Sequence, residues 1–163
     1  MILESCASSN YWCRVFSAYG HKVKLINPAY VRPYVKTNKN DAADAEALCE
    51  AAARPTMRFV QSKTPEQQDV QLLHRVRKGL VSRRTSLSNQ LRGLLGEYGI
   101  TINEGINNVR KQLPRILEDA ENDLSSAGRC VFAQLYDELV EIDKRVESLS
   151  KQLTQLSKSH SRC

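Results

Sequence analysis

The sequence lacks any long apolar run, which argues against a membrane-spanning helix. A helix that crosses a bilayer needs roughly 18–20 consecutive apolar residues, and no segment approaches that length. The opening MILESCASS also lacks the basic start and the apolar stretch of a secretory signal. From these two absences we expect a cytoplasmic protein that makes no contact with membranes.

Cysteine and histidine are present but lack the spacing of a metal site or a disulfide framework. No C-x-x-C pair occurs, and the number of cysteines is odd. The three histidines are too dispersed to indicate shared ligation. We therefore predict free thiols or small buried groups at Cys6, Cys13, Cys49, Cys130 and Cys163.

Acidic residues are scarce at the start of the chain, and the net charge of +6 is unevenly distributed. Residues 1–40 carry six basic residues and one acid, Glu4, whereas residues 41–53 carry four acids and no base. Residues 54–92 carry nine bases and two acids. Two basic blocks around an acidic patch suit a polyanion presented to a metal ion. Solvated helix faces are the alternative explanation.

Local patterns in the first third predict alternating strands and helices. KVKLI alternates charged and apolar residues as a strand does, and Gly20 is placed to end the helix before it. Asn40 is placed to cap the Ala-rich helix that follows. We expect Tyr11 and Trp12 to lie in the core. Strand, helix, strand, helix and helix in this order imply a βαβ unit with parallel pairing.

From Thr64 the pattern is helical. TPEQ carries the Thr, Pro and Gln of a capping box. An apolar stripe then follows at Leu73, Val76, Leu80, Leu87, Leu91 and Leu94, interrupted by Arg83 and Arg84. A short helix is predicted near VRKQLPRILEDAE, and heptad spacing over 131–156 indicates a coiled coil. The coiled coil can close as a hairpin within one chain or between two chains.

Asp41 and Asp44 are the principal candidates for chemistry. Residues at i and i+3 share a helix face, so both carboxylates can bind one divalent cation or a close pair. Their place in the first helical turn also favours negative charge. Ordinary helix capping explains the same pattern. Glu4, on the first predicted strand, is the only upstream carboxylate that can join them.

Several segments together closely resemble the DEDD transposases of bacterial insertion sequences, of the "one-ten" type. The resemblance is carried by the stretch from GHKVKLINPAY to FVQSK, by QQDVQLLHRVRKGLVSRRTSLSNQLRGLLGEYGI and by LPRILEDAEN. It runs from residue 1 to about residue 155 in matching order and spacing.

The resemblance implies α/β plus α architecture. A partial RNase H-like (RuvC-like) catalytic domain over 1–63 precedes a long helical coiled-coil hairpin over 64–158. From its place at the chain terminus, the tail over 159–163 is predicted to be disordered. The resemblance assigns Glu4, Asp41 and Asp44 as Mg²⁺ or Mn²⁺ ligands in DNA strand cleavage and joining. It also implies DNA as partner and a guide-type RNA in some members. The heptad spacing over 131–156 predicts a homodimer or higher oligomer through the coiled coil. The residues expected to bind nucleic acid are Lys36, Lys39, Asn40, Arg58, Arg75, Arg77, Lys78, Arg83, Arg84 and Arg92.

The family pattern has two parts that we do not find. The first Asp of the family lies on a strand that should precede MILE, and a nucleophilic serine lies in a separate C-terminal domain. We therefore expect an incomplete fragment with little or no strand transfer of its own. The alternatives are a non-catalytic coiled-coil dimer that binds nucleic acid through basic helices, and a product of a decayed gene with no present function.

Overall fold

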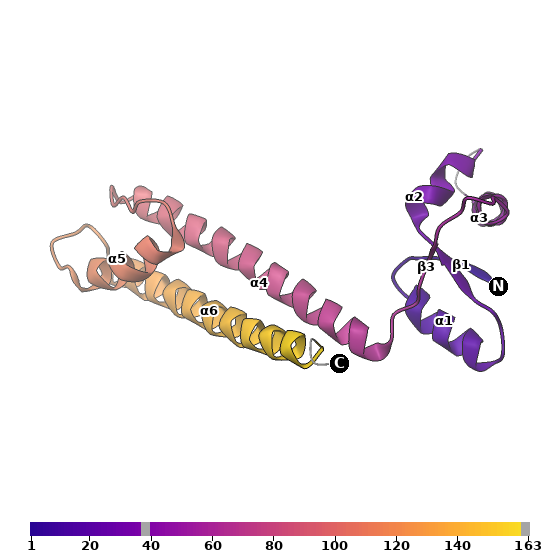
Figure 1. The fold of residues 1–163 in the computed structure, drawn as a ribbon. Coiled ribbons are helices and arrows are strands. Elements are labelled where there is room, and N and C mark those ends of the chain that lie inside the picture. The colour runs from indigo at the N-terminus through magenta and orange to yellow at the C-terminus, as the bar shows by residue number, and fades with distance from the viewer. Residues whose placement is uncertain (37–39, 161–163) are drawn as a thin grey trace. The chain divides into compact units, whose positions relative to one another are not determined.

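The fold consists of two compact units, each described here by itself: Met1–Gln68, the N-terminal unit, and Asp69–Cys163, the helical unit. The structure is a computed structural model and describes residues 1–36 and 40–160 (Figure 1). Lys39, one of the predicted nucleic-acid contacts, lies outside the described residues, as does the end of the predicted tail.

The N-terminal unit contains a three-stranded sheet in the order β1-β2-β3. β1 (Ile2–Glu4) pairs with β2 (Lys24–Ile26) in parallel, and β3 (Phe59–Val60) pairs with β2 antiparallel. The crossover between the parallel strands is α1 (Ser9–Ala18). The predicted βαβ unit is therefore confirmed.

Gly20 ends α1 as predicted, because the backbone there requires φ of +87°. The Gly20 N–H bonds the Ser17 carbonyl at 3.0 Å and the His21 N–H bonds the Phe16 carbonyl at 3.1 Å. These two bonds form a Schellman motif, which satisfies carbonyls that the helix itself leaves unpaired. The prediction for Tyr11 and Trp12 is wrong: they are 55% and 45% exposed, because α1 turns Cys13 rather than these rings toward the interior.

Three helical segments complete the N-terminal unit: α2 (Pro28–Val31), the 3-10 turn η1 (Arg32–Tyr34) and α3 (Asp41–Ala52). The buried core joins Ile26 and Val31 to Ala47 and Ala51 of α3. Alanine at both helical positions lets the α3 backbone approach the sheet closely, because no longer side chain intervenes. The same alanines favour the helix itself.

α4 (Pro65–Gly96) begins at the predicted capping box. The Gln67 N–H donates to Thr64 Oγ1 at 3.3 Å, and the Thr64 N–H donates to Gln67 Oε1 at 3.1 Å. Each side chain thus satisfies a backbone donor of the other residue. Arg14 of α1 donates to the Lys63 carbonyl and to Gln68 Oε1, which holds this first turn against the N-terminal unit.

The helical unit consists of most of α4 with α5 (Ile106–Glu118) and α6 (Ser126–His160). α4 and α6 lie side by side, with opposite chain directions shown by paired contacts between Arg77 and Ser150 and between Arg84 and Asp143 (Figure 1). α5 packs against α6. One apolar core joins the three helices: Leu80, Leu87, Leu91, Leu95, Ile102, Val109, Leu113, Leu124, Phe132, Leu139, Ile142 and Val146.

The apolar stripe predicted on α4 is partly wrong. Val76 and Leu94 are each 40% exposed, whereas Leu95, outside the predicted stripe, is fully buried. Leu91 and Leu95, four residues apart, belong to the core that also contains Ile102 and the α5 residues Val109 and Leu113, whereas Leu94 does not.

α5 contains a proline that interrupts its backbone bonding. Pro114 has no N–H to donate to the Arg110 carbonyl, the acceptor four residues earlier. The Tyr136 hydroxyl of α6 donates to that carbonyl at 3.3 Å. A side chain from a neighbouring helix thus replaces the missing backbone bond.

Among the residues that the structure describes, no helix is long and apolar enough to cross a membrane. Cys6, Cys13, Cys49 and Cys130 are free thiols, as predicted, and of these only Cys13 is buried.

Candidate metal and nucleic-acid sites

The acidic pair lies in the first turn of α3, where Asn40 fixes the start of the helix. Asn40 Oδ1 accepts a hydrogen bond from the Ala43 N–H at 2.7 Å. This bond makes Asn40, rather than Asp41, the N-cap. Asp41 and Asp44 are therefore not needed for capping, and both carboxylates are exposed.

Glu4 and Asp44 line the same hollow, which has a volume of about 670 Å³. Glu4 ends β1, and α3 packs against that strand. Arg32 of η1 also lines this hollow, which we call the carboxylate hollow. The structure thus places two of the three predicted ligands, forty residues apart in the sequence, on the same hollow. Asp41 is not among the residues that line it.

The described residues contain no group of three or more His, Cys, Asp or Glu side chains arranged to hold a metal ion. Two carboxylates on one hollow nevertheless fit Mg²⁺, which typically takes one or two protein carboxylates and completes its shell with water and substrate phosphates. The donor set is therefore compatible with a hard divalent cation, and the cysteines contribute no soft ligand to the hollow.

Lys36 belongs to an ion-pair network with the acidic helix. Its Nζ lies 3.3 Å from Glu50 Oε2 and 3.6 Å from Glu46 Oε1. The hydrogen bond to Glu50 raises the pKa of Lys36, and the same bond lowers the pKa of Glu50. Lys36 is 65% exposed, so the network remains accessible to solvent. A phosphate that approaches Lys36 must compete with these two carboxylates.

Arg58 lines a second hollow of about 390 Å³ in the N-terminal unit, together with Arg54, Tyr30 and Tyr34. The Arg54 guanidinium lies 5.3 Å from the centre of the Tyr34 ring, a cation–π contact. The sequence analysis predicted Arg58 as a nucleic-acid contact but not Arg54. Arg54 lies in the turn after α3, where no sequence pattern indicated a role in binding.

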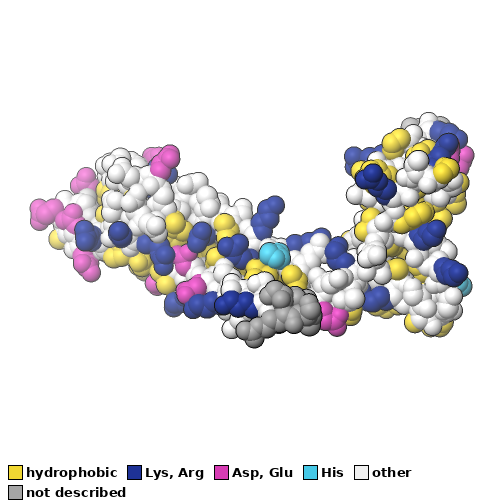
Figure 2. Space-filling model, viewed as in Figure 1, with side chains coloured by type: hydrophobic (Ala, Val, Ile, Leu, Met, Phe, Trp, Pro, Cys, Tyr) yellow, Lys and Arg dark blue, Asp and Glu magenta, His cyan; other side chains and the backbone are white. Residues whose placement is uncertain are grey.

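The predicted nucleic-acid contacts on α4 fall into two groups: cations exposed to solvent, and arginines bonded to neighbouring elements. Arg75 and Lys78 are exposed and form no ion pair with any residue in 1–36 or 40–160. Arg83 is 65% exposed and lies 3.3 Å from Glu138. Figure 2 shows Lys and Arg side chains gathered along the helical unit. Arg75, Lys78 and Arg83 are therefore the α4 cations most accessible to a polyanion.

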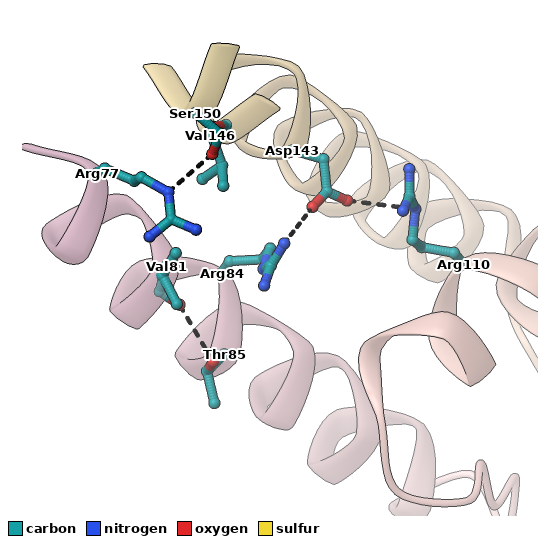
Figure 3. Close-up of polar contacts among 8 residues, drawn as sticks. All are labelled: Arg77, Val81, Arg84, Thr85, Arg110, Asp143, Val146 and Ser150. Atoms are coloured by element: carbon teal, nitrogen blue, oxygen red, sulfur yellow. Dashed lines mark hydrogen bonds and ion pairs between the residues drawn. The ribbon is translucent and has the colours of Figure 1, made fainter. Parts of the chain in front are cut away.

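The other three arginines face neighbouring elements. Arg77 Nε donates to Ser150 Oγ at 2.8 Å, and Arg92 Nε donates to the Ile102 carbonyl at 3.0 Å. Arg84 Nη1 donates to Asp143 Oδ1 at 3.0 Å (Figure 3). These three bonds connect α4 to neighbouring elements. The Arg84 bond also explains why a cation interrupts the apolar stripe at that position.

Asp143 joins two arginines from two different helices. Its Oδ2 lies 3.2 Å from Arg110 Nε of α5, while the carboxylate side chain is only 9% exposed (Figure 3). The Arg110 contact is an ion pair and not a hydrogen bond. Within the described part of the chain, Asp143 Oδ2 and Arg84 Nε are buried without a hydrogen-bond partner.

The sequence itself decides the family. Residues 2–100, more than half of the chain, match the DEDD transposases of the IS110 type. The chain belongs to the DEDD transposase family. Its similarity to individual transposases extends beyond the matched region, through the helical unit.

This DEDD transposase chain is 43% identical over 163 residues to the transposase for insertion sequence element IS1111A of Coxiella burnetii. That match covers 100% of this chain and 45% of the relative. A probable family 20 transposase of Pseudomonas aeruginosa is 44% identical over 152 residues, which are 93% of this chain and 45% of that protein. The transposase for IS1328 of Yersinia enterocolitica is 49% identical over 119 residues, 73% of this chain and 35% of that protein.

This DEDD transposase chain thus spans less than half the length of the curated relatives that it matches. No solved structure matches the chain.

Proposed function

We propose that this chain acts in an insertion-sequence transposase, supplying carboxylates to a divalent-cation site and a basic surface to nucleic acid. One observation carries the proposal: Glu4 and Asp44, far apart in the sequence of a DEDD transposase, line one hollow. In this proposal the N-terminal unit is part of an RNase H-like (RuvC-like) domain, and α4 with α6 forms a coiled-coil hairpin.

Glu4 and Asp44 would hold Mg²⁺ or Mn²⁺, with Asp41 as a further carboxylate in the same helical turn. The N-terminal end of α3 favours negative charge, which lowers the free-energy cost of keeping Asp41 and Asp44 ionised in the same helical turn. When bound, the ion would polarise a scissile phosphate and stabilise the oxygens that attack and leave.

The chain's own groups would position the DNA. Arg32 lines the carboxylate hollow and offers a guanidinium that can take two phosphate oxygens at once. Arg58 in the N-terminal unit and Arg75 and Lys78 on α4 would contact the phosphate backbone, which fixes register but carries no base specificity. The same cations suit a guide-type RNA. Completion of the reaction would require the nucleophile and a further carboxylate from the rest of a full-length transposase.

The test compares metal-dependent DNA binding and nicking of the wild type with Asp44→Asn and Glu4→Gln variants. Each variant removes one charge from the carboxylate hollow, so we expect Mn²⁺ affinity to fall by roughly tenfold or more. The gain in DNA binding that the metal confers should disappear with it. Isothermal titration with Mn²⁺ and a gel-shift series with and without metal measure the two effects.

Glu46→Gln is the matched control, because Glu46 lies on the same helix, is 70% exposed and does not line the carboxylate hollow. It should leave Mn²⁺ affinity within about twofold of the wild type. Equal Mn²⁺ affinity in the wild type, Asp44→Asn and Glu4→Gln proteins would refute the metal site.

A non-catalytic coiled-coil dimer is the second candidate, and exposed apolar side chains on α4 favour it. Leu72 is 57% exposed and Val76, one turn further, is 40% exposed. Two such residues at i and i+4 form an apolar strip that a second copy can cover. The double substitution Leu72→Lys/Val76→Lys should then convert a sedimenting dimer to a monomer. The control variant Arg75→Glu/Lys78→Glu, on the same helical turns, should leave the sedimenting mass that of the dimer. A wild-type monomer at micromolar concentration would exclude this candidate.

A further inference from the structure

A polar hollow of about 390 Å³ lies beside the carboxyl-terminal half of α4, within the helical unit. One wall consists of α4 residues between Arg84 and Arg92, and the other of Glu104, Gly105 and Ile106 at the start of α5. We call it the α4–α5 hollow. None of the predicted metal ligands lines it, so it is separate from the carboxylate hollow.

Ser88, a nearly buried residue, provides a hydroxyl without a protein partner in this wall. The residue is only 5% exposed and is one of two buried polar residues in the described part of the chain. The other, Ser9, donates its hydroxyl to the Cys6 carbonyl, whereas the Ser88 hydroxyl forms no hydrogen bond with the described residues. Among the described residues, the fully buried polar side-chain atoms without a partner are Arg84 Nε and Asp143 Oδ2, so the Ser88 hydroxyl is open to the hollow that the residue lines and is available to a ligand there.

The opposite wall presents the amino-terminal end of α5, a helix of 13 residues. Gly105 is its N-cap, with φ of +104°, and has no side chain with which to cap the first turn. The N–H groups of Gly105 and Ile106 donate to no backbone carbonyl of the described residues. Uncapped N–H groups and the positive end of the helix dipole together favour a bound anion.

The charges around the α4–α5 hollow also favour an anion. Asp143 is shared between Arg84 and Arg110, so this cluster keeps one excess positive charge. Arg84 Nε is buried without a hydrogen-bond partner. Arg92 uses its Nε to hold the Ile102 carbonyl, which leaves the rest of its guanidinium available. Glu104, which is exposed, is the one carboxylate on the described lining.

From these features we infer that the α4–α5 hollow binds a phosphate group, held by the Ser88 hydroxyl, the Arg84 and Arg92 guanidiniums and the first N–H groups of α5. Convergent donors on two walls and a net positive charge match a tetrahedral anion with several acceptor oxygens. The inference does not depend on the carboxylate hollow or on a bound metal. The phosphate can belong to a nucleic-acid backbone or be free in solution.

The first experiment titrates inorganic phosphate into the full chain in a chloride buffer without divalent metal, followed by calorimetry. Ser88→Ala should weaken phosphate binding on the order of tenfold, because it removes a hydrogen bond to a charged ligand. Ser88→Asp should abolish binding, because it places a carboxylate among the donors. Glu104→Gln should tighten binding roughly threefold, because it removes the opposing charge.

Glu141→Gln is the control for net charge, since Glu141 is exposed on α6 and does not line the hollow. It should leave phosphate affinity unchanged. Because Glu104 is exposed, its variant keeps the test valid even if Ser88→Asp fails to fold. No detectable phosphate binding by the wild type, or equal binding by the wild type, Ser88→Ala and Glu104→Gln proteins, would overturn the inference.

A second arm distinguishes the two sources of phosphate. A single-stranded oligonucleotide with internal phosphodiesters only is titrated into the same variants. If Ser88→Ala weakens binding of the oligonucleotide and of inorganic phosphate alike, the hollow takes backbone phosphate. If only inorganic phosphate binding weakens, the hollow takes a free phosphate. Both results support the hollow as a phosphate site, and neither involves the metal response of Asp44→Asn.

Discussion

Replacing Leu91 by alanine should lower the free energy of unfolding of the helical unit by about 3–4 kcal/mol, the largest effect that we expect from a single substitution. Leu91 is fully buried and belongs to the core that joins α4, α5 and α6. Truncation removes apolar contact and leaves a cavity, which three helices fixed by further contacts cannot close completely. Urea unfolding followed by the helical circular dichroism signal measures the loss.

Leu94→Ala is the control for this prediction. Leu94 lies on the same helix, three residues further, and is 40% exposed. The same chemical change there should cost less than about 1 kcal/mol, since little apolar surface leaves the core. Equal losses for Leu91→Ala and Leu94→Ala would show that α4 presents a different face to its neighbours.

Asp143→Ala should destabilise the helical unit by about 2–3 kcal/mol, because two arginines lose their shared partner. The Asp143 side chain is 9% exposed and Arg84 is 27% exposed, so solvent compensates only in part. The effect should exceed that of a surface ion pair, which contributes about 0–1 kcal/mol. Urea unfolding at low and high salt measures the loss and its screening.

Asp137→Ala supplies the matched control, since Asp137 is an exposed aspartate on the same helix. It should change stability by less than about 0.5 kcal/mol. The double variant Arg84→Met/Asp143→Leu should recover most of the stability lost in Asp143→Ala, because apolar replacements need no ionic partner. If the Asp143→Ala protein were as stable as the Asp137→Ala protein, the contacts of Asp143 with Arg84 and Arg110 would contribute nothing to the free energy of unfolding.

The sequence predicted the ends of the helices well because these are determined by neighbouring residues. Asn40 caps α3, Thr64 and Gln67 form the capping box of α4, and Gly20 ends α1. Each motif needs only a few consecutive residues and a definite backbone shape. The parallel pairing of β1 with β2 also followed from local order, since a helix between two short strands imposes it.

Burial within the helical unit was harder to predict, because it depends on partners that are distant in the sequence. Leu94 was assigned to the buried stripe and Leu95 was not, yet the structure buries Leu95. Arg84 was predicted to contact nucleic acid, whereas a carboxylate from α6 accepts its hydrogen bond. Periodicity gives one face of a helix, but it does not tell which distant residues pack against the helix or pair with its charged side chains.

The candidate metal site was predicted in part. Resemblance to the family named Glu4 and Asp44 together, and the structure places both on one hollow. Whether they bind metal stays a prediction, as does the role of Asp41. Arg32 on the same hollow was missed, because it sits in a short turn whose direction no sequence pattern reveals.

The Pro114–Tyr136 contact has a consequence for how the helical unit folds. An isolated α5 would leave the Arg110 carbonyl to water, and 13 residues with an internal proline are too few to hold a helix by themselves. In the folded unit the Tyr136 hydroxyl of α6 donates to that carbonyl. We therefore expect α5 to form and to melt together with α6 rather than by itself.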